Sequence, residues 1–195
     1  MNKTITFALT LMTVFAFAIN TTDGYALEAN AATQSIVFPS LPKTLAEFKA
    51  LPQASMESPY LTAALFVVAF SLYPQNPNES IDMINFLKGP ESLSPREINL
   101  IREQVRDKSY LPRSYFAGAN PKNDYTPSLP YTVVVSDNAA SFGSDNTARL
   151  FVRCGGADSP RPITLRKAKD GKWYLWDHVS LLVGIRIPES SNPWL

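Results

Sequence analysis

Apolar residues in the first half of the chain follow the spacing of helices. The most apolar stretch, 61–73, is hydrophobic on every side and begins after Ser58-Pro59, an N-cap residue followed by proline at the first helical position. A helix that is apolar around its whole circumference is buried on all sides, and about 15 residues are too few to cross a membrane. We therefore expect this helix to form the centre of the core, with the other elements packed around it.

Three further helices are predicted around this central helix. Thr44 and Glu47, and likewise Ser94 and Glu97, have the spacing of a capping box, in which side chains and backbone amides at a helix start satisfy each other's hydrogen bonds. Asn76, followed by a proline and an acid, begins a helix in the same way. The predicted helices cover 44–51, 76–89 and 94–107.

The second half of the chain changes to the two-residue period of strands. Within 148–154, apolar residues alternate with Arg149, Phe151 and Arg153, so one side of that strand is apolar and the other is not. Asp170-Gly171 is a two-residue hairpin signal between the last two strands. Strands are expected at 35–38, 131–135, 148–154, 163–167 and 172–176, and 179–187 adds a strand or a short helix.

Helices first and antiparallel strands last predict the α+β class. N-terminal helices pack on a C-terminal antiparallel sheet of four or five strands in this arrangement. A sheet curved around a helix, as in NTF2-like cone folds, is one specific form, by analogy of element order alone.

Two segments between these elements have the composition of structured loops. Gly155 and Gly156 open 155–162, which also holds two prolines, and adjacent glycines permit a positive φ or the close approach of another backbone. A hairpin corner and a ligand-contacting loop both fit this segment. The longer segment 110–127 is rich in Pro, Asn and Tyr, and its aromatic residues either line a pocket or hold the loop down: Tyr115, Phe116 and Tyr125.

The N-terminus has the pattern of a secretory signal peptide. One lysine precedes fifteen uncharged, mostly apolar residues, 5–19, and Ala29-Asn30-Ala31 offers a cleavage site before Ala32. We expect 1–31 to be a signal peptide, which predicts an exported protein, secreted or in the cell envelope, with no transmembrane span after cleavage. A retained N-terminal anchor is the alternative. The remaining chain divides into a lead-in with a short helix, 32–58, a single domain, 59–188, and a tail, 189–195.

Charge and residue inventory narrow the classes of function. Eighteen basic against seventeen acidic residues give a net charge of +1, which argues against nucleic acid as a partner. Cys154 is the only cysteine and His178 the only histidine, so neither a disulfide framework nor a multi-histidine metal site is expected, and no cofactor is predicted. Seven basic residues and two acids fall within 149–172, as either a solvated strand face or an anion-binding surface.

The chain contains several distinctive short motifs, among them Asn85-Phe86-Leu87-Lys88-Gly89-Pro90, Arg113-Ser114-Tyr115-Phe116-Ala117-Gly118-Ala119, Gly155-Gly156-Ala157-Asp158-Ser159-Pro160-Arg161 and Trp173-Tyr174-Leu175-Trp176. Together these motifs resemble an uncharacterised bacterial family, DUF6935. The resemblance covers about Pro59 to Pro188. It implies a recurring domain, often carried by exported bacterial proteins, and brings no activity with it.

Three hypotheses for the function remain. The first is a non-enzymatic module for an anionic or envelope-associated ligand, small or polymeric, with Arg153, Arg161 and Arg166 as its positive lining and Tyr115 and Tyr125 as its stacking surface. Asp158 and Ser159 complete this candidate site, and no residue is assigned a catalytic role. The second is a scaffold that docks an envelope protein on an exposed sheet face or edge. The third is a small hydrolase, which requires four polar residues to converge: Asp158, Ser159, Asp177 and His178.

Overall fold

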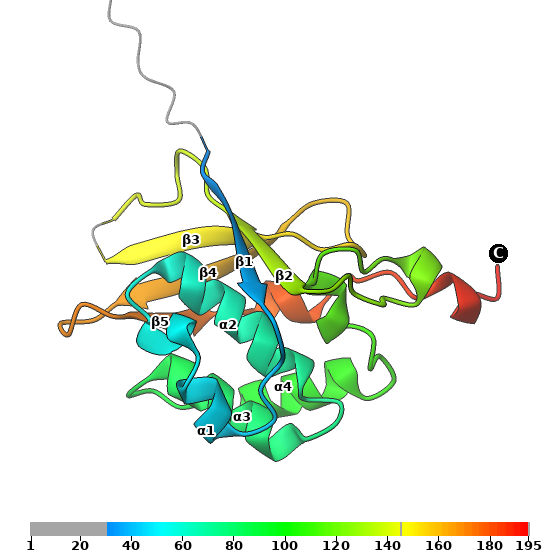
Figure 1. Cartoon of the computed structure of the whole chain (residues 1–195), viewed down its shortest axis with the longest axis horizontal. Helices are drawn as coiled ribbons and strands as arrows, with labels where there is room; N and C mark the ends of the chain where they lie inside the picture. Colours follow the sequence, from blue (N-terminus) through cyan, green and yellow to red (C-terminus); the bar gives the residue numbers. More distant parts are fainter. Residues whose placement is uncertain (1–30, 145, 195) are drawn as a thin grey trace, which may run out of the picture.

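The computed structural model describes residues 31–144 and 146–194, so the expected signal peptide lies outside the described residues. Four α-helices occupy the first half of the described chain (Figure 1). Their bounds are α1 Leu45–Lys49, α2 Pro59–Ser71, α3 Pro77–Lys88 and α4 Pro95–Val105. All four predicted helices are confirmed.

The strands form one five-stranded antiparallel sheet in the order β1-β2-β3-β4-β5. Their bounds are β1 Thr33–Phe38, β2 Tyr131–Ser136, β3 Thr147–Val152, β4 Arg161–Lys167 and β5 Trp173–Asp177. The α+β class is confirmed. The segment left open at the C-terminal end forms a short 3-10 helix, Val179–Leu182.

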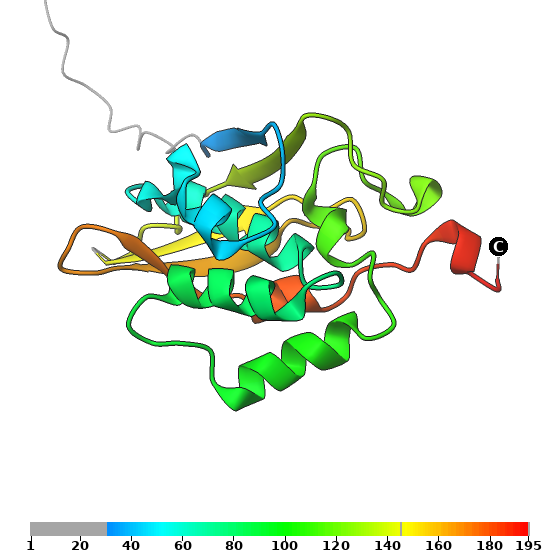
Figure 2. The same cartoon turned by 60° about the horizontal axis from the view of Figure 1, so that its bottom comes forward.

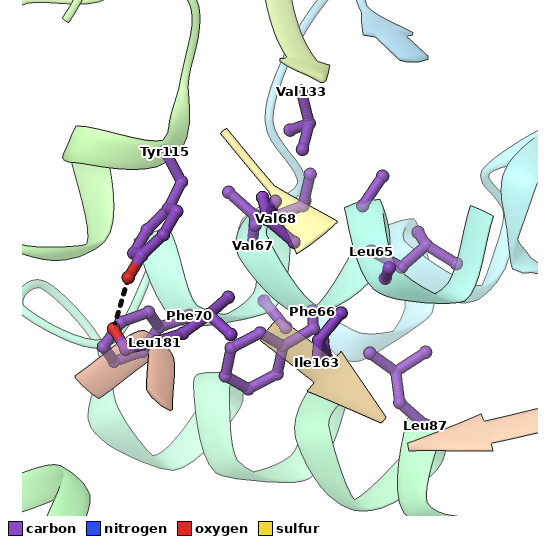
Figure 3. Packing of buried hydrophobic residues seen from close by; sticks show 14 of the residues in the cluster. Leu65, Phe66, Val67, Val68, Phe70, Leu87, Tyr115, Val133, Ile163 and Leu181 are labelled. Atoms are coloured by element: carbon purple, nitrogen blue, oxygen red, sulfur yellow. Dashed lines mark hydrogen bonds between the residues drawn. The ribbon is translucent and has the colours of Figure 1, made fainter. Parts of the chain in front are cut away.

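The central helix α2 lies across the sheet and is buried at every position except Leu61 (Figures 1 and 3). Its neighbours include β1 to β5 and α3, which explains why no side of it is polar. The buried hydroxyls of Thr62 and Ser71 are satisfied, because Thr62 donates to the carbonyl of Trp173 at 2.9 Å and Ser71 to that of Val68 at 2.7 Å. Figure 2 shows α4 as the outermost helix, and its narrower apolar face, with Ile101 and Val105 buried, suits that place.

The lead-in 32–58 belongs to the same core as the rest of the domain. β1 pairs with β2 along its whole length, and Phe38 and Phe48 are fully buried. The expected domain began at residue 59, after this segment. The sequence does not show which elements the segment packs against, because the partner of its strand lies far along the chain. The octapeptide 155–162 also ends earlier than expected, since Arg161 and Pro162 already belong to β4 and pair with β3.

Strand β2 pairs with β1 along one edge, but the partner on its other edge changes part-way along. Its end pairs with β3 at Val135 and Ser136, whereas Val133 forms an isolated bridge with Phe116. The amide of Ala117 donates to the carbonyl of Thr132 at 2.8 Å. Residues 116–117 therefore occupy the place that β3 would hold if the pairing continued, and the sheet forks at this point.

Candidate functional site

The sheet has a helix-covered face and a face without helices. Apolar side chains of β3, β4 and β5 point toward α2 and are buried. The alternate positions are exposed or half-buried, as the two-residue period requires. We call this second side the open face; its residues include Val134, Arg149, Phe151, Thr164, Arg166, Tyr174 and Trp176.

A pocket of about 300 Å³ lies at the β5 edge of the open face. It forms between the end of α3 and the β4–β5 hairpin, and we call it the Trp176 pocket. Its lining includes two aromatic rings, four cations and one carboxylate: Tyr174, Trp176, Lys88, Arg166, Lys167, Lys169 and Glu91. The indole of Trp176 is 47% exposed, an unusual value for so large a ring.

The cations of the Trp176 pocket differ in how they are held. The ammonium of Lys88 is paired with Glu97 at 3.0 Å and is largely buried. The guanidinium of Arg166 lies 4.7 Å from the centre of the Trp176 ring, so it is oriented by a cation–π contact. Among the described residues, no ion pair involves Arg166, Lys167 or Lys169.

Tyr174 is fixed in the pocket wall by contacts at both ends. Its ring lies against Gly89, where a Cβ would come within 2.4 Å of the ring carbons. Its hydroxyl donates to Asp170 at 2.7 Å, and this hydrogen bond is the first cause that lowers the pKa of the Asp170 carboxyl below its usual value. The motifs at 85–90 and 173–176 thus meet and build this pocket together.

A second hollow lies beside the fork between β2 and β3. Two adjoining pockets of about 280 and 410 Å³ share Val134 and Arg153 in their lining, and we call them together the Arg153 groove. One wall is the segment 115–120 and the other is the loop 154–160. Arg153 is exposed, and no ion pair within the described residues includes it.

The two glycines of the loop allow the walls of this groove to touch. A Cβ on Gly155 would lie 1.7 Å from the carbonyl oxygen of Ala119, and one on Gly156 would lie 2.2 Å from the hydroxyl of Tyr125. The amide of Gly155 also donates to the carbonyl of Ser114 at 2.9 Å. Neither position has a positive φ, so what each requires is room for a close neighbour: the backbone of Ala119 at Gly155 and the side chain of Tyr125 at Gly156.

The three predicted arginines do not form one lining. Arg166 lies in the Trp176 pocket and Arg153 in the groove. The guanidinium of Arg161 donates to the carbonyl of Gly184 at 2.6 Å, and its Nε is buried without a hydrogen-bond partner in the described residues. Arg161 thus ties the first residue of β4 to the segment after the 3-10 helix Val179–Leu182, and it lines neither hollow. Its place in the same loop as Asp158 suggested the grouping, but its side chain turns elsewhere.

Asp158 and Ser159 line the groove next to Arg153. The carboxylate of Asp158 is paired with Arg186, so its charge is offset. Ser159 presents an exposed hydroxyl at the same rim. Sequence reasoning grouped these two residues with Arg153, and the fold brings the three together.

Tyr115 and Tyr125 are core residues, which corrects their expected role as a stacking surface. Tyr115 is 1% exposed and donates its hydroxyl to the carbonyl of Leu181 at 2.8 Å (Figure 3). Tyr125 is fully buried and donates to the carbonyl of Arg186 at 2.6 Å, and burial is the main cause that raises its pKa to about 12. Trp176 is the exposed aromatic ring of β5, and its outward place follows from the alternation with buried Trp173 and Leu175.

The four polar residues named for a hydrolase lie in different surroundings. Asp158 and Ser159 line the groove, and Asp177 ends β5. His178 is 1% exposed, with its ring centre 4.9 Å from that of Phe66 in α2. Cys154 is also buried, where its thiol lies 3.3 Å from the hydroxyl of Ser114. The convergence that a hydrolase requires is absent from this set of described residues.

Within the part of the chain that the structure describes, neither a metal-ligand cluster nor a membrane-spanning helix is found. Over 31–144 and 146–194, no group of three or more His, Cys, Asp and Glu side chains is placed to hold a metal ion. No helix in this part of the chain has the length and apolar character needed to cross a bilayer.

Comparison with known proteins places the chain in a family without giving it a function. No curated protein and no solved structure matches the chain. The family described as "Domain of unknown function (DUF6935)" matches residues 40–189, a range that begins after β1 and takes in α1 to α4, β2 to β5 and most of both hollows. The match covers well over half of the sequence, and the chain belongs to the DUF6935 family.

Proposed function

We propose that this protein is a non-enzymatic module that binds an anionic ligand at the Trp176 pocket. The observation that carries the proposal is the pair of cations outside any described ion pair, Arg166 and Lys169, beside a half-exposed indole. The third cation of the lining, Lys167, directs its ammonium to the ring of Trp173, 5.7 Å from the ring centre. Cations that only solubilise a surface are usually spread among acids, whereas this pocket holds one carboxylate on its lining, Glu91. A ring-bearing ligand with carboxylate, sulfate or phosphate groups fits this combination.

Arg166 is the residue expected to contact the anion directly. A guanidinium offers two parallel N–H donors to a carboxylate or sulfate, and such charge-assisted hydrogen bonds are among the strongest in proteins. The contact with Trp176 restricts the arginine before a ligand arrives, so less side-chain entropy is lost on binding. The remaining indole surface supplies apolar contact for the body of the ligand.

The proposal is tested by measuring affinity for dextran sulfate and for uncharged dextran at low and moderate salt. Binding of the sulfated polymer alone, weakened by salt, is expected. Arg166→Ala and Trp176→Ala are each expected to weaken it about tenfold, the loss typical of one charged hydrogen bond or one aromatic contact. Arg96→Ala, which removes an exposed arginine from α4, is the matched control and keeps the affinity of the wild type. Equal losses in all three variants would point to non-specific charge attraction and reject the pocket.

Export of the protein is part of the same proposal. A charged start, the uncharged run 5–19 and the small residues at 29–31 support it. Expression of the full chain in a bacterium with a Sec pathway is expected to yield an extracytoplasmic protein whose N-terminal sequence starts at Ala32. An intact Met1 on the exported or membrane-bound protein would instead indicate a retained anchor.

A second candidate function is docking of another protein on the sheet edge formed by β1. This strand contains no proline and no charged residue, and Val37 on it is 43% exposed. An open edge of this kind accepts an additional strand from a partner. Under this alternative, Ser35→Pro would abolish recovery of a defined partner from culture supernatant, and Arg166→Ala would leave it unchanged.

A further inference from the structure

We infer that the Trp176 pocket and the Arg153 groove are two subsites for one extended ligand, an anionic polysaccharide that runs along β3 on the open face. The inference rests on the proposed function of the Trp176 pocket. It adds a second contact region, a direction and a class of ligand.

The register of the sheet sets the distance between the two subsites. Arg166 in β4 pairs with Thr147, and Arg153 follows Thr147 by six residues along the line of β3. Residues in a strand advance about 3.3 Å each, so the two arginines stand roughly 20 Å apart along the strand. A single sugar or a small anion does not bridge that distance, whereas a chain of several sugar units does.

The surface between the two arginines continues the same chemistry. Arg149 and Phe151 are the open-face residues of β3 on this path, with the guanidinium of Arg149 5.8 Å from the centre of the Phe151 ring. The path therefore repeats the pairing of a cation with an aromatic ring that Arg166 and Trp176 make. No carboxylate belongs to β3, so nothing on that strand repels an anionic chain.

The groove favours a polymer that carries hydroxyl groups as well as acids. Its lining combines Arg153 with the hydroxyls of Thr33, Ser136 and Ser159, which both donate and accept hydrogen bonds. It also holds Asp158, a carboxylate offset by Arg186. An acceptor of this kind suits a sugar hydroxyl and disfavours a chain with a phosphate at every unit. An acidic polysaccharide matches this lining better than a nucleic acid does.

The test measures affinity for a series of oligogalacturonates of increasing length, with sulfated oligosaccharides as a second series. The affinity is expected to rise at least tenfold once the oligomer is long enough to reach both subsites, because the second contact becomes intramolecular. Arg153→Ala is expected to remove this gain and to leave the affinity of short oligomers unchanged. Arg166→Ala weakens short and long oligomers alike, and Arg96→Ala weakens neither.

The results distinguish a ligand that spans both subsites from a ligand bound at the Trp176 pocket alone. A flat dependence on length, or a long oligomer unaffected by Arg153→Ala, would overturn the inference while the Trp176 pocket stands. Failure of both series to bind would overturn the proposed function as well. A single-stranded oligonucleotide that binds more tightly, with the same dependence on Arg153 and Arg166, would overturn the assignment to a polysaccharide. Circular dichroism of each variant confirms that the comparison is made between folded proteins.

Discussion

Gly155→Ala is expected to destabilise the protein by about 3 kcal/mol, in the range found for overpacked cores. The added methyl would lie 1.7 Å from the carbonyl oxygen of Ala119, which belongs to backbone and has no rotamer to change. The segment 115–120 and the loop after β3 must therefore move apart. Their separation strains the hydrogen bond from the amide of Gly155 to Ser114, and Ser114 is fully buried. The free energy of unfolding, measured by urea titration, gives the size of the effect.

Gly143→Ala is the matched control for this substitution. Gly143 has no positive φ, and the nearest atom to an added Cβ is a carbonyl oxygen at 3.7 Å. Replacing a glycine in a compatible conformation by alanine raises the free energy of unfolding by about 0.4–1 kcal/mol, because the unfolded chain loses conformational entropy. A Gly155 variant as stable as the Gly143 variant would contradict the close approach of the two walls. The Arg153 groove would then have a different shape.

The second large effect is a dependence of stability on pH that comes from His178. Burial is the main cause that lowers its pKa to about 4, and Lys88 adds to the shift while Glu97 and Asp177 oppose it. Both ring nitrogens lack a hydrogen-bond partner in the described residues. Between pH 6.5 and 4 the unfolded chain binds a proton at this site and the folded chain does not. The free energy of unfolding therefore falls as the pH drops through this window, by about 3 kcal/mol.

The variants His178→Phe and His178→Leu remove the imidazole that titrates and keep an apolar side chain against Phe66. We expect both variants to lose less stability than the wild type between pH 6.5 and 4, with the difference close to the same 3 kcal/mol. Other titrating groups are common to all three proteins and cancel in the difference. One such group is Glu97, whose pKa of about 2 is lowered, against burial, by Ser94 and Lys88. Parallel stability curves for wild type and variants would show that His178 is protonated in the fold or reached by water.

Local sequence signals were sufficient to find the four α-helices and the five strands of the described chain, but not its short 3-10 helices. The capping box of Ser94 and Glu97 forms as predicted, and Asn76 accepts from the amide of Glu79. The box predicted for Thr44 and Glu47 forms only in part, because the Glu47 carboxylate accepts from the amide of Lys43 and not from that of Thr44. Signals of this kind act within a few residues, so they are readable from the sequence. The same signals did not reveal that β1 pairs with β2, because the partners are separated by the whole helical half.

The candidate site was only partly predictable from the sequence. The alternation in β3 placed Arg149 and Arg153 on one side of the strand, and the structure agrees. The direction of Arg161 and the burial of Tyr115 depend on loops that meet only in the folded state. Polarity alone does not separate a tyrosine that stacks on a ligand from one that donates to a buried carbonyl.

Periodicity, caps and motifs are local properties, so they were enough to identify an α+β domain of the DUF6935 type with a central helix that is apolar on every side. Which of these motifs come into contact depends on the tertiary structure and is not visible in the sequence. The motif 85–90 meets 173–176 at the Trp176 pocket, and 113–119 meets 155–161 at the Arg153 groove. Those meetings follow from sheet register and from glycines that admit a close neighbour, the ring of Tyr174 at Gly89 and the backbone of Ala119 at Gly155, and both are contacts between distant residues.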